Sequence, residues 1–499
     1  MISLGIDIGG TGCKCVAFRD DGTQLALSYE EYPLSAGTVQ LPAEVLLQSA
    51  CHVIAACAEK LENPGEICAL SAASFGESFA AIGEDGKPLG DILLYFGNSQ
   101  NEEFRQTVER VGAEAFMRIN RIPPDASYSL SKMLYTLKTA PKKVHKFLFA
   151  ASFLCYYLSG KACTDVSLAC RSLLFDVEKE EWSETLAKAC GIPMDTLPDV
   201  VPSGTAIGTI LPEIADRLKL PRSCQIVIGG HDQIVNALGA GVEALGDAVD
   251  TSGTCECVTP LFAKIPESFE FQKNNFACVP YCGTGGYVTY AYNISAGSVV
   301  RWYRDALGGG LAEEAKKRGV SIYDLLNESC PETPTDLLVL PFLQGMGGTP
   351  DVKPDAVGTI FGLTTQTRLP DIYRAILEGV TFEMRYNQEK LTENGVTFRR
   401  LLACGGGARS RAWLQIKADI LGCEMIPVLT EETGAMGSAI LALAAVTGKA
   451  PFEIAGRFRR YGEPIRPDPE RRAIYDRRYE TYRLLRRLYL QNTADRETC

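Results

Sequence analysis

Two short stretches of the chain repeat one order of apolar and polar positions. In the first, apolar or alternating residues at 2–8 and 14–18 flank a Gly-Gly-Thr-Gly turn. The second, DAVDTSGTCECVTP at 247–260, reproduces that order with one residue of slip. Strand patterns joined by a short glycine-bearing gap are typical of a β-hairpin. The sequence therefore predicts two similar hairpins, one in each half of the chain.

The other apolar patterns predict that strands and helices alternate along both halves. The expected strands lie at 24–32, 66–73 and 226–228. The expected helices lie at 43–61, over most of 103–160, and at 233–241, 371–392, 411–421 and 434–447. Such alternation favours α/β layers. A chain of 499 residues is too long for one core, and a seam near residue 244 predicts domains at 1–244 and 245–499.

Composition and charge exclude several classes of partner. With 46% hydrophobic and 22% charged residues, the chain has the composition of an ordinary globular protein. A net charge of −11 argues against nucleic acid and anionic membranes as partners. The tail from Arg457 to Arg487 carries 11 Arg, but its interleaved acids favour a solvated amphipathic helix.

The location expected from the sequence is the cytoplasm. No run approaches the roughly 18 apolar residues that a membrane span needs, and the N-terminus enters a strand without a basic segment. The 18 Cys are scattered without a CxxC pair, and only three His accompany them, so zinc is not expected. We interpret the thiols as small core residues in a reducing compartment, with a redox role as the minor alternative.

The residues of the two hairpins suit a polyphosphate. Glycine at a hairpin tip exposes backbone N–H groups, a Thr adds a hydroxyl, and an Asp beside the tip can organise a hydrated Mg²⁺. Neither a GxxxxGK[ST] loop nor a GxGxxG fingerprint is present, so the hairpins are the phosphate-binding candidates. The alternative for each hairpin is an ordinary turn. The candidates are Asp7, Gly9, Gly10 and Thr11 in the first hairpin, and Thr251, Ser252, Gly253 and Thr254 in the second.

Five segments, in this order, resemble those of the FGGY carbohydrate kinases, among them xylulokinase- and fuculokinase-like members. They are LGIDIGGTGCKCVAF (4–18), GGHDQIVNALGAG (229–241), DTSGT (250–254), VLPFLQGMGGTPDVKPDAVGTIFGLTTQTRLPDIYRAILEGVTFEMR (339–385) and LLACGGGARSRAWLQIKADILG (401–422). The resemblance covers nearly the whole chain. It implies an α/β fold of two actin-like (ribonuclease H-like) ATPase domains with a central interdomain cleft, as in the actin/hexokinase/Hsp70-like superfamily. It also implies ATP and Mg²⁺ as cofactors.

The resemblance assigns roles to several residues. Asp232 is the expected catalytic base, although from the sequence alone it could equally cap the helix that follows. Asp7 is expected to position Mg²⁺ through water, and Asp232 is the second metal candidate. The adenosine loop is expected at Gly405, Gly406, Gly407, Ala408 and Ser410.

The acceptor site departs from the family pattern. The substrate-binding candidates are Phe75, Gly76, Glu77, Asn98 and Gln233. The departures fall at 73–78, 95–100 and 345–350, the segments expected to determine substrate specificity. The sequence therefore leaves open which sugar is the substrate and which of its hydroxyls is phosphorylated. Lys132 is a secondary candidate that we place on a helix surface.

The resemblance implies an ATP-dependent kinase, a phosphotransferase that moves the γ-phosphoryl of ATP to an alcohol of a ketose or polyol. The ketose would be a pentulose, hexulose or deoxyketose, and ATP would favour a closed cleft. One alternative is an ATP-driven conformational regulator or chaperone on the same scaffold, and another is a kinase of a non-nutrient signal molecule. The expected partners are ATP and a small sugar or polyol, without nucleic acid or membrane, and the resemblance allows a homodimer.

Overall fold

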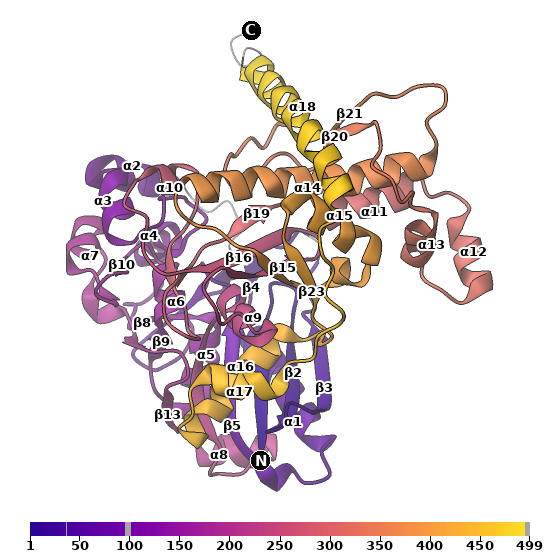
Figure 1. Cartoon of the computed structure of the whole chain (residues 1–499). Helices are drawn as coiled ribbons and strands as arrows, with labels where there is room; N and C mark the ends of the chain where they lie inside the picture. Colours follow the sequence, from indigo (N-terminus) through magenta and orange to yellow (C-terminus); the bar gives the residue numbers. More distant parts are fainter. Residues whose placement is uncertain (36, 95–100, 495–499) are drawn as a thin grey trace. The chain divides into compact units, whose positions relative to one another are not determined.

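The computed structural model describes residues 1–35, 37–94 and 101–494 (Figure 1). Their contacts divide the chain into two compact units. The first unit comprises residues 1–243, 277–288 and 432–459, and the second comprises 244–276, 289–431 and the chain from 460 onward. In the part of the chain that is described, no helix is long and apolar enough to cross a membrane.

The first predicted hairpin forms part of the main sheet of the first unit. β1 (Ile2–Ile8) and β2 (Gly12–Arg19) pair antiparallel, which confirms this hairpin, and β3 (Gln24–Glu31) continues the sheet. On the other side, β5 (Ile67–Ser74) runs parallel to β1, and β14 (Gln225–His231) runs parallel to β5. The carboxyl ends of three adjacent parallel strands therefore lie at one edge of this sheet, a usual place for a ligand site in α/β proteins.

One face of this sheet is covered by α16 (Thr433–Thr447), which also packs on α9 (Asp232–Ala240) (Figure 1). α16 lies so close to β1 and α9 that only glycine fits at the points of contact. A Cβ atom at Gly5 would lie 1.8 Å from the carbonyl oxygen of Ala435, and one at Gly437 would lie 2.0 Å from that of Val235. The opposite face packs against α1 (Ala43–Glu59) and α5 (Ala150–Ser159), whose apolar residues form a core with Leu4, Ile6 and Ile8.

The contacts do not divide the chain by a single cut. α16 and α17 (Pro451–Phe458) belong to the second half of the sequence, yet they pack with the first unit because their small and apolar residues are buried there. The contact units therefore share one boundary with the predicted 1–244 and 245–499 domains, whose assignment stays a prediction.

The second unit is built around the second predicted hairpin. β15 (Asp247–Ser252) and β16 (Glu256–Phe262) pair antiparallel, which confirms this hairpin. β22 (Arg400–Cys404) runs parallel to β15, β23 (Glu424–Pro427) runs parallel to β22, and β19 (Ala291–Asn293) pairs with β16. In the sheet of each unit, two further strands thus run parallel to the first strand of the hairpin and lie beside it. The repeated sequence pattern corresponds to a repeated topology.

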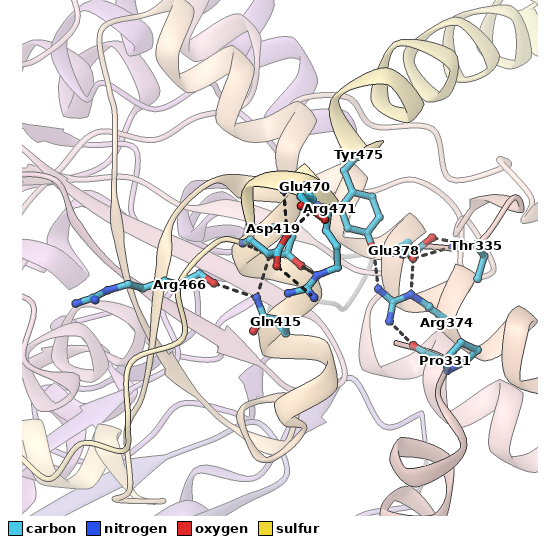
Figure 2. Close-up of polar contacts among 11 residues, drawn as sticks. Pro331, Thr335, Arg374, Glu378, Gln415, Asp419, Arg466, Glu470, Arg471 and Tyr475 are labelled. Atoms are coloured by element: carbon cyan, nitrogen blue, oxygen red, sulfur yellow. Dashed lines mark hydrogen bonds and ion pairs between the residues drawn. The ribbon is translucent and has the colours of Figure 1, made fainter. Parts of the chain in front are cut away.

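Three long helices pack together in the second unit: α14 (Leu369–Glu393), α15 (Arg411–Leu421) and α18 (Pro469–Ala494). The predicted amphipathic terminal helix is α18, which buries Tyr475, Tyr479 and Tyr482 against Phe382. Buried polar contacts fix the helices to one another (Figure 2). Asp419 on α15 accepts a hydrogen bond from Arg471 Nε at 2.6 Å.

The remaining elements are mostly short. In the first unit they are β4 (Gln40–Leu41), η1 (Pro64–Glu66), β6 (Phe79–Ile82), β7 (Ile92–Leu93), α2 (Asn101–Val111), α3 (Ala113–Ile119), α4 (Ser129–Thr139), β8 (Lys146–Phe149), β9 (Cys163–Asp165), α6 (Val166–Cys170), β10 (Phe175–Asp176), β11 (Glu181–Trp182), α7 (Glu184–Cys190), η2 (Met194–Thr196), β12 (Asp199–Val201), β13 (Ala206–Thr209), α8 (Pro212–Leu218), β17 (Val279–Pro280) and β18 (Tyr287–Val288). In the second unit they are α10 (Glu270–Lys273), α11 (Gly297–Ala306), α12 (Leu311–Arg318), α13 (Ile322–Ser329), β20 (Leu338–Leu340), β21 (Thr359–Phe361) and η3 (Gly406–Arg409). The segment 103–160 is largely helical, as predicted, with β8 as its short strand.

Candidate functional site

The first hairpin places Asp7 one residue before the end of β1. Its register partner on β2 is Lys14, and the turn closes where the Gly9 N–H donates to the Gly12 carbonyl at 2.9 Å. Lys14 Nζ in turn pairs with the carboxylate of Glu432. Burial raises the pKa of Asp7 to about 6; the Lys14 charge opposes this rise and the Glu432 charge adds to it. Sequence reasoning missed Lys14, although the alternation of β2 could have placed it opposite Asp7.

Asp232 stands where β14 ends and α9 begins. His231 occupies the helix N-cap position, and no side-chain cap bond is made there. Asp232 is thus the first residue of the helix, which does not fit the alternative that it caps this helix. Its side chain retains 30% exposure, whereas His231 beside it retains 6%. The side chain is therefore mostly buried but keeps some contact with solvent where β14 ends.

The protonation of Asp232 is strongly perturbed. Its pKa is raised to about 8, chiefly by burial and further by the negative charges of Asp7 and Glu77. His231 Nε2 lies 3.3 Å from Asp232 Oδ1, and burial, together with the charge of Arg171, holds the pKa of His231 well below its usual range. His231 is therefore neutral beside this carboxylate. A carboxyl group with a pKa near the working pH is suited to accept a proton in catalysis.

The acceptor candidates follow β5, whose carboxyl end adjoins those of β1 and β14. Glu77 is 8% exposed, has a left-handed φ of 40°, and accepts a hydrogen bond from Arg171 Nε at 2.6 Å. A Cβ atom at Gly76 would lie 2.9 Å from Arg171 Cγ and 3.1 Å from His231 Cδ2, so this turn reaches the neighbourhood of Asp232. Arg171 was missed from the sequence because it lies 94 residues from Glu77.

The other acceptor candidates differ in their surroundings. Phe75 is 4% exposed and belongs to the hydrophobic core. Gln233 Oε1 is buried without a hydrogen-bond partner among the described residues, so it can accept a bond from a ligand hydroxyl. Asn98 lies outside the described residues.

Lys132 is not on a helix surface, and that expectation is wrong. Its side chain is fully buried in α4, and Nζ donates to the carbonyl oxygen of Ser127 at 2.5 Å. Burial lowers the pKa of Lys132 to about 8, although Glu77 and Asp125 favour its charged form. A lone Lys in a helical pattern gave no sign of this burial.

In the second unit, two predicted nucleotide loops lie against each other. They follow adjacent parallel strands, because Thr251 on β15 pairs with Cys404 on β22. Gly405 has a φ of 81°, and a Cβ atom on it would lie 2.7 Å from the Ser252 carbonyl oxygen. A Cβ atom on Gly407 would lie 2.6 Å from Ser252 Cβ. Larger residues could not keep these loops in contact.

The tip of the second hairpin is supported by α11. The Gly253 N–H donates to the Cys255 carbonyl at 2.8 Å, and the Ser298 N–H donates to the Thr254 carbonyl at 2.9 Å. Arg301 Nη2 donates to Thr254 Oγ1 at 2.9 Å. Arg301 thus brings a positive charge to the predicted phosphate loop, and nothing in the sequence near DTSGT indicated it.

Ser410 and Trp413 stabilise the helix after the predicted adenosine loop. The Ser410 hydroxyl accepts from the Trp413 N–H at 3.2 Å and donates to Asn327 Oδ1 at 2.7 Å. Trp413 is 4% exposed and donates from Nε1 to Thr381 Oγ1 at 3.2 Å. The neighbouring Ala408 is half-buried. Local contacts thus occupy the Ser410 hydroxyl, whereas Gly405 and Gly406 leave exposed backbone.

The residues of the first unit fit a Mg²⁺ held mainly by other ligands. Among the described residues, no group of three or more His, Cys, Asp or Glu is arranged to hold a metal. The negative charge of Asp7, however, contributes to the high pKa of Asp232. A cation near both would relieve this repulsion. Mg²⁺ commonly uses one or two carboxylates and completes its shell with water and phosphate oxygens.

The chain resembles known proteins over both of its halves. Residues 2–239 match the N-terminal domain of the FGGY family of carbohydrate kinases, and residues 251–446 match the C-terminal domain of that family. The chain belongs to the FGGY family of carbohydrate kinases. It is 25% identical to a xylulose kinase of Lactococcus lactis over 96% of this chain and 95% of the relative. It is 28% identical to a gluconokinase of Bacillus subtilis over 89% and 88%, respectively.

Solved structures show that this FGGY chain has the expected fold. A gluconate kinase from Lactobacillus acidophilus aligns with a TM-score of 0.86 at 21% identity, covering 98% of each chain. A xylulose kinase from Rhodospirillum rubrum aligns with a TM-score of 0.86 at 22% identity, covering 97% of this chain and 98% of that one. The predicted two-domain actin-like fold is confirmed, while the predicted cleft between the domains stays a prediction.

Proposed function

We propose that this FGGY protein is an ATP-dependent kinase that phosphorylates a hydroxyl of a neutral ketose or polyol. The observation that supports it most directly is Asp232, a partly exposed carboxylate with a pKa of about 8 beside Asp7 and Glu77 at the carboxyl edge of the sheet. An alcohol becomes a good nucleophile only as its proton leaves, and Asp232 can accept that proton from a hydroxyl about 2.6–3.2 Å away. Glu77 and Gln233 supply acceptors for other hydroxyls of the sugar.

The other groups bind and neutralise the nucleotide. Phosphoryl transfer passes through a loose transition state, so positioning and charge neutralisation carry most of the catalysis. The backbone N–H groups of the first hairpin, with Thr11, and those of residues 251–254 would bind the phosphates. Residues 405–408 would lie against the purine and ribose. Asp7 and Asp232 would hold Mg²⁺ together with the phosphates, and the ion would supply positive charge against the phosphate oxygens.

Charge favours a neutral acceptor over a sugar acid. Around Asp232 lie the carboxylates of Asp7 and Glu77, while Arg171 is engaged by Glu77 and Lys132 donates to a backbone carbonyl. A substrate carboxylate would meet the negative charges of Asp7 and Glu77 beside Asp232. We therefore expect a ketose or polyol, in line with the xylulose kinases among the relatives, and discrimination against gluconate.

The alternative of an ATP-driven regulator or chaperone is disfavoured by the family match over both halves of the chain. A kinase for a non-nutrient signal molecule uses the same chemistry, so only its acceptor distinguishes it. A coupled assay of ADP release over pentuloses, hexuloses, deoxyketoses, polyols and gluconate separates these functions, with the product mapped by NMR. Release stimulated by a neutral sugar supports the proposal. Stimulation by none of them contradicts it, and stimulation by gluconate alone contradicts the neutral acceptor.

We further infer that the enzyme works in the reducing cytoplasm and that it can form a homodimer. All 17 Cys of the described chain carry free thiols, and 11 of them are buried, which suits small core residues. Sedimentation velocity at micromolar concentration tests the oligomeric state, and a single monomeric species would contradict the dimer.

A further inference from the structure

A fully buried group of charges lies behind the second hairpin. Lys417 Nζ is 2.5 Å from Asp250 Oδ2 and 2.5 Å from Glu256 Oε1, and it donates to Ser252 Oγ at 2.5 Å. The side chains of Lys417 and Asp250 are 1% exposed, and that of Glu256 is 0% exposed. Ser252 Oγ also donates to Asp250 Oδ1 at 2.9 Å.

The fold brings these residues together from three elements. Asp250 and Ser252 are two positions apart on β15, so their side chains point to the same face. Glu256 is the register partner of Ser252 on β16 and shares that face. Lys417 reaches them from α15, the helix that follows the loop at 405–410. One ammonium group therefore joins the two strands of the hairpin to the helix behind the neighbouring loop.

The charges of this group are unequal, because two carboxylates share one ammonium. The pKa of Glu256 rises to about 7: burial is the main cause, the Lys417 charge opposes it and the Asp250 charge adds to it. Burial opposes the charge of Lys417, yet the two carboxylates hold its pKa above the usual value. Buried ion pairs often contribute little net stability, and their best-attested use is to fix a geometry.

Other contacts make α15 a rigid support for Lys417. Asp419 lies two residues further along the helix. It accepts hydrogen bonds from Arg471 Nε at 2.6 Å and from Gln415 Nε2 at 2.9 Å (Figure 2). The Lys417 ammonium also lies 4.8 Å from the ring centre of the buried Trp413. Because α15 is fixed, the position of Lys417 determines where Ser252 lies relative to the loop at 405–410.

We propose that Lys417 is a positioning residue that keeps the 250–254 hairpin and the 405–410 loop in one arrangement, so that both parts of the nucleotide site are formed before ATP binds. This inference rests on the proposed function, because it assigns ATP to these two loops. Lys417 would act through Ser252 and the backbone of the hairpin, without touching ATP. Its loss should weaken ATP binding and leave the acceptor's KM unchanged.

The test uses the double variant Lys417→Met/Glu256→Gln in the full chain. It removes one charge of each sign, so the net charge of the buried group is unchanged. We expect the Kd for ATP, measured by calorimetry, to rise between about 10- and 100-fold, as for a binding group displaced by about an ångström. The acceptor's KM should stay within about twofold, because the described acceptor candidates belong to the first unit and Lys417 belongs to the second.

The matched control is Arg374→Met/Glu378→Gln, the same exchange in another buried ion pair of the second unit. Arg374 Nε donates to Glu378 at 2.8 Å, and the two side chains are 5% and 2% exposed (Figure 2). This control should lower thermal stability with ATP affinity unchanged. An equal loss of ATP affinity in the control, or none in the Lys417 variant, would overturn the proposal.

A second variant covers the case in which the first does not fold. Asp250→Asn keeps the shape of the side chain and replaces a charged partner of Lys417 by a neutral one. We expect the Kd for ATP to rise about fivefold, the difference between a charged and a neutral hydrogen bond; an unchanged Kd would overturn the proposal. If the wild type binds ATP but phosphorylates no sugar, the proposed function fails while these Kd values still decide the role of Lys417. If the wild type binds no ATP, both fail.

Discussion

Replacing Asp232 by Asn should stabilise the unliganded protein, and increasingly so as the pH rises toward 8. The pKa of this carboxyl is about 8 in the folded protein, against about 3.9 in an unfolded chain. Between these values the folded protein keeps a proton that the unfolded chain releases. Wild-type stability therefore falls as the pH rises, by up to about 1.4 kcal/mol per pH unit, whereas Asn does not titrate.

Urea unfolding without Mg²⁺ or nucleotide, followed by circular dichroism at pH 5.5 and 7.5, measures this effect. The free-energy difference between Asp232→Asn and wild type should grow by about 2 kcal/mol over this interval, slightly less than the full two-unit value because the side chain is 30% exposed. Above pH 8.5 the difference should level off. Asp195→Asn, at a carboxylate whose side chain is 71% exposed, is the control and should show no such trend. A difference for Asp232→Asn that stays constant from pH 5.5 to 7.5 would refute the reasoning.

Three further predictions concern charge, nucleotide binding and packing. Glu77→Gln removes a charge that raises the pKa of Asp232, so the rise of kcat/KM with pH should move to lower pH. An unchanged pH profile would show that Glu77 does not influence the catalytic base. Arg301→Ala should raise the KM for ATP about tenfold, near the 1.4 kcal/mol of one charged hydrogen bond, with the acceptor's KM as the internal control. Gly437→Ala should cost about 1–3 kcal/mol in urea unfolding, because its Cβ atom would lie 2.0 Å from the Val235 carbonyl oxygen; wild-type stability would contradict this packing.

The sequence predicted the features that depend on local patterns. Both hairpins, the helix after Asp232 and the long helices at 369–393 and 411–421 have clear apolar periodicity and glycine boundaries, and all are present. The phosphate-binding role of the hairpin residues comes from the same short segments and stays a prediction. The hairpins and helices were predicted correctly because each rests on residues that are neighbours in the chain.

The sequence did not predict contacts between distant segments. Glu77 and Arg171 are 94 residues apart, and Lys417 lies 165 residues from Ser252, so no spacing rule connects them. Burial also reversed one interpretation, because a single Lys on a helix gives no sign that Lys132 faces the interior. The packing of α16 with the first unit depends on glycines that lie against carbonyl oxygens of other segments. The sequence does not show which carbonyl oxygens these are.

The central claim is that Asp232 accepts the proton of the sugar hydroxyl while the nucleotide loops bind ATP. The kinetics of Asp232→Asn test this claim most directly. Calorimetry gives the affinity for ATP, and a rapid-quench assay with the accepted sugar gives the rate of phosphoryl transfer. Because Asp7 and the phosphates would still hold Mg²⁺, the account predicts nearly wild-type ATP binding together with a transfer rate reduced by about 10²- to 10⁴-fold, the usual contribution of a general base. Sugar phosphorylation at close to the wild-type rate would contradict it.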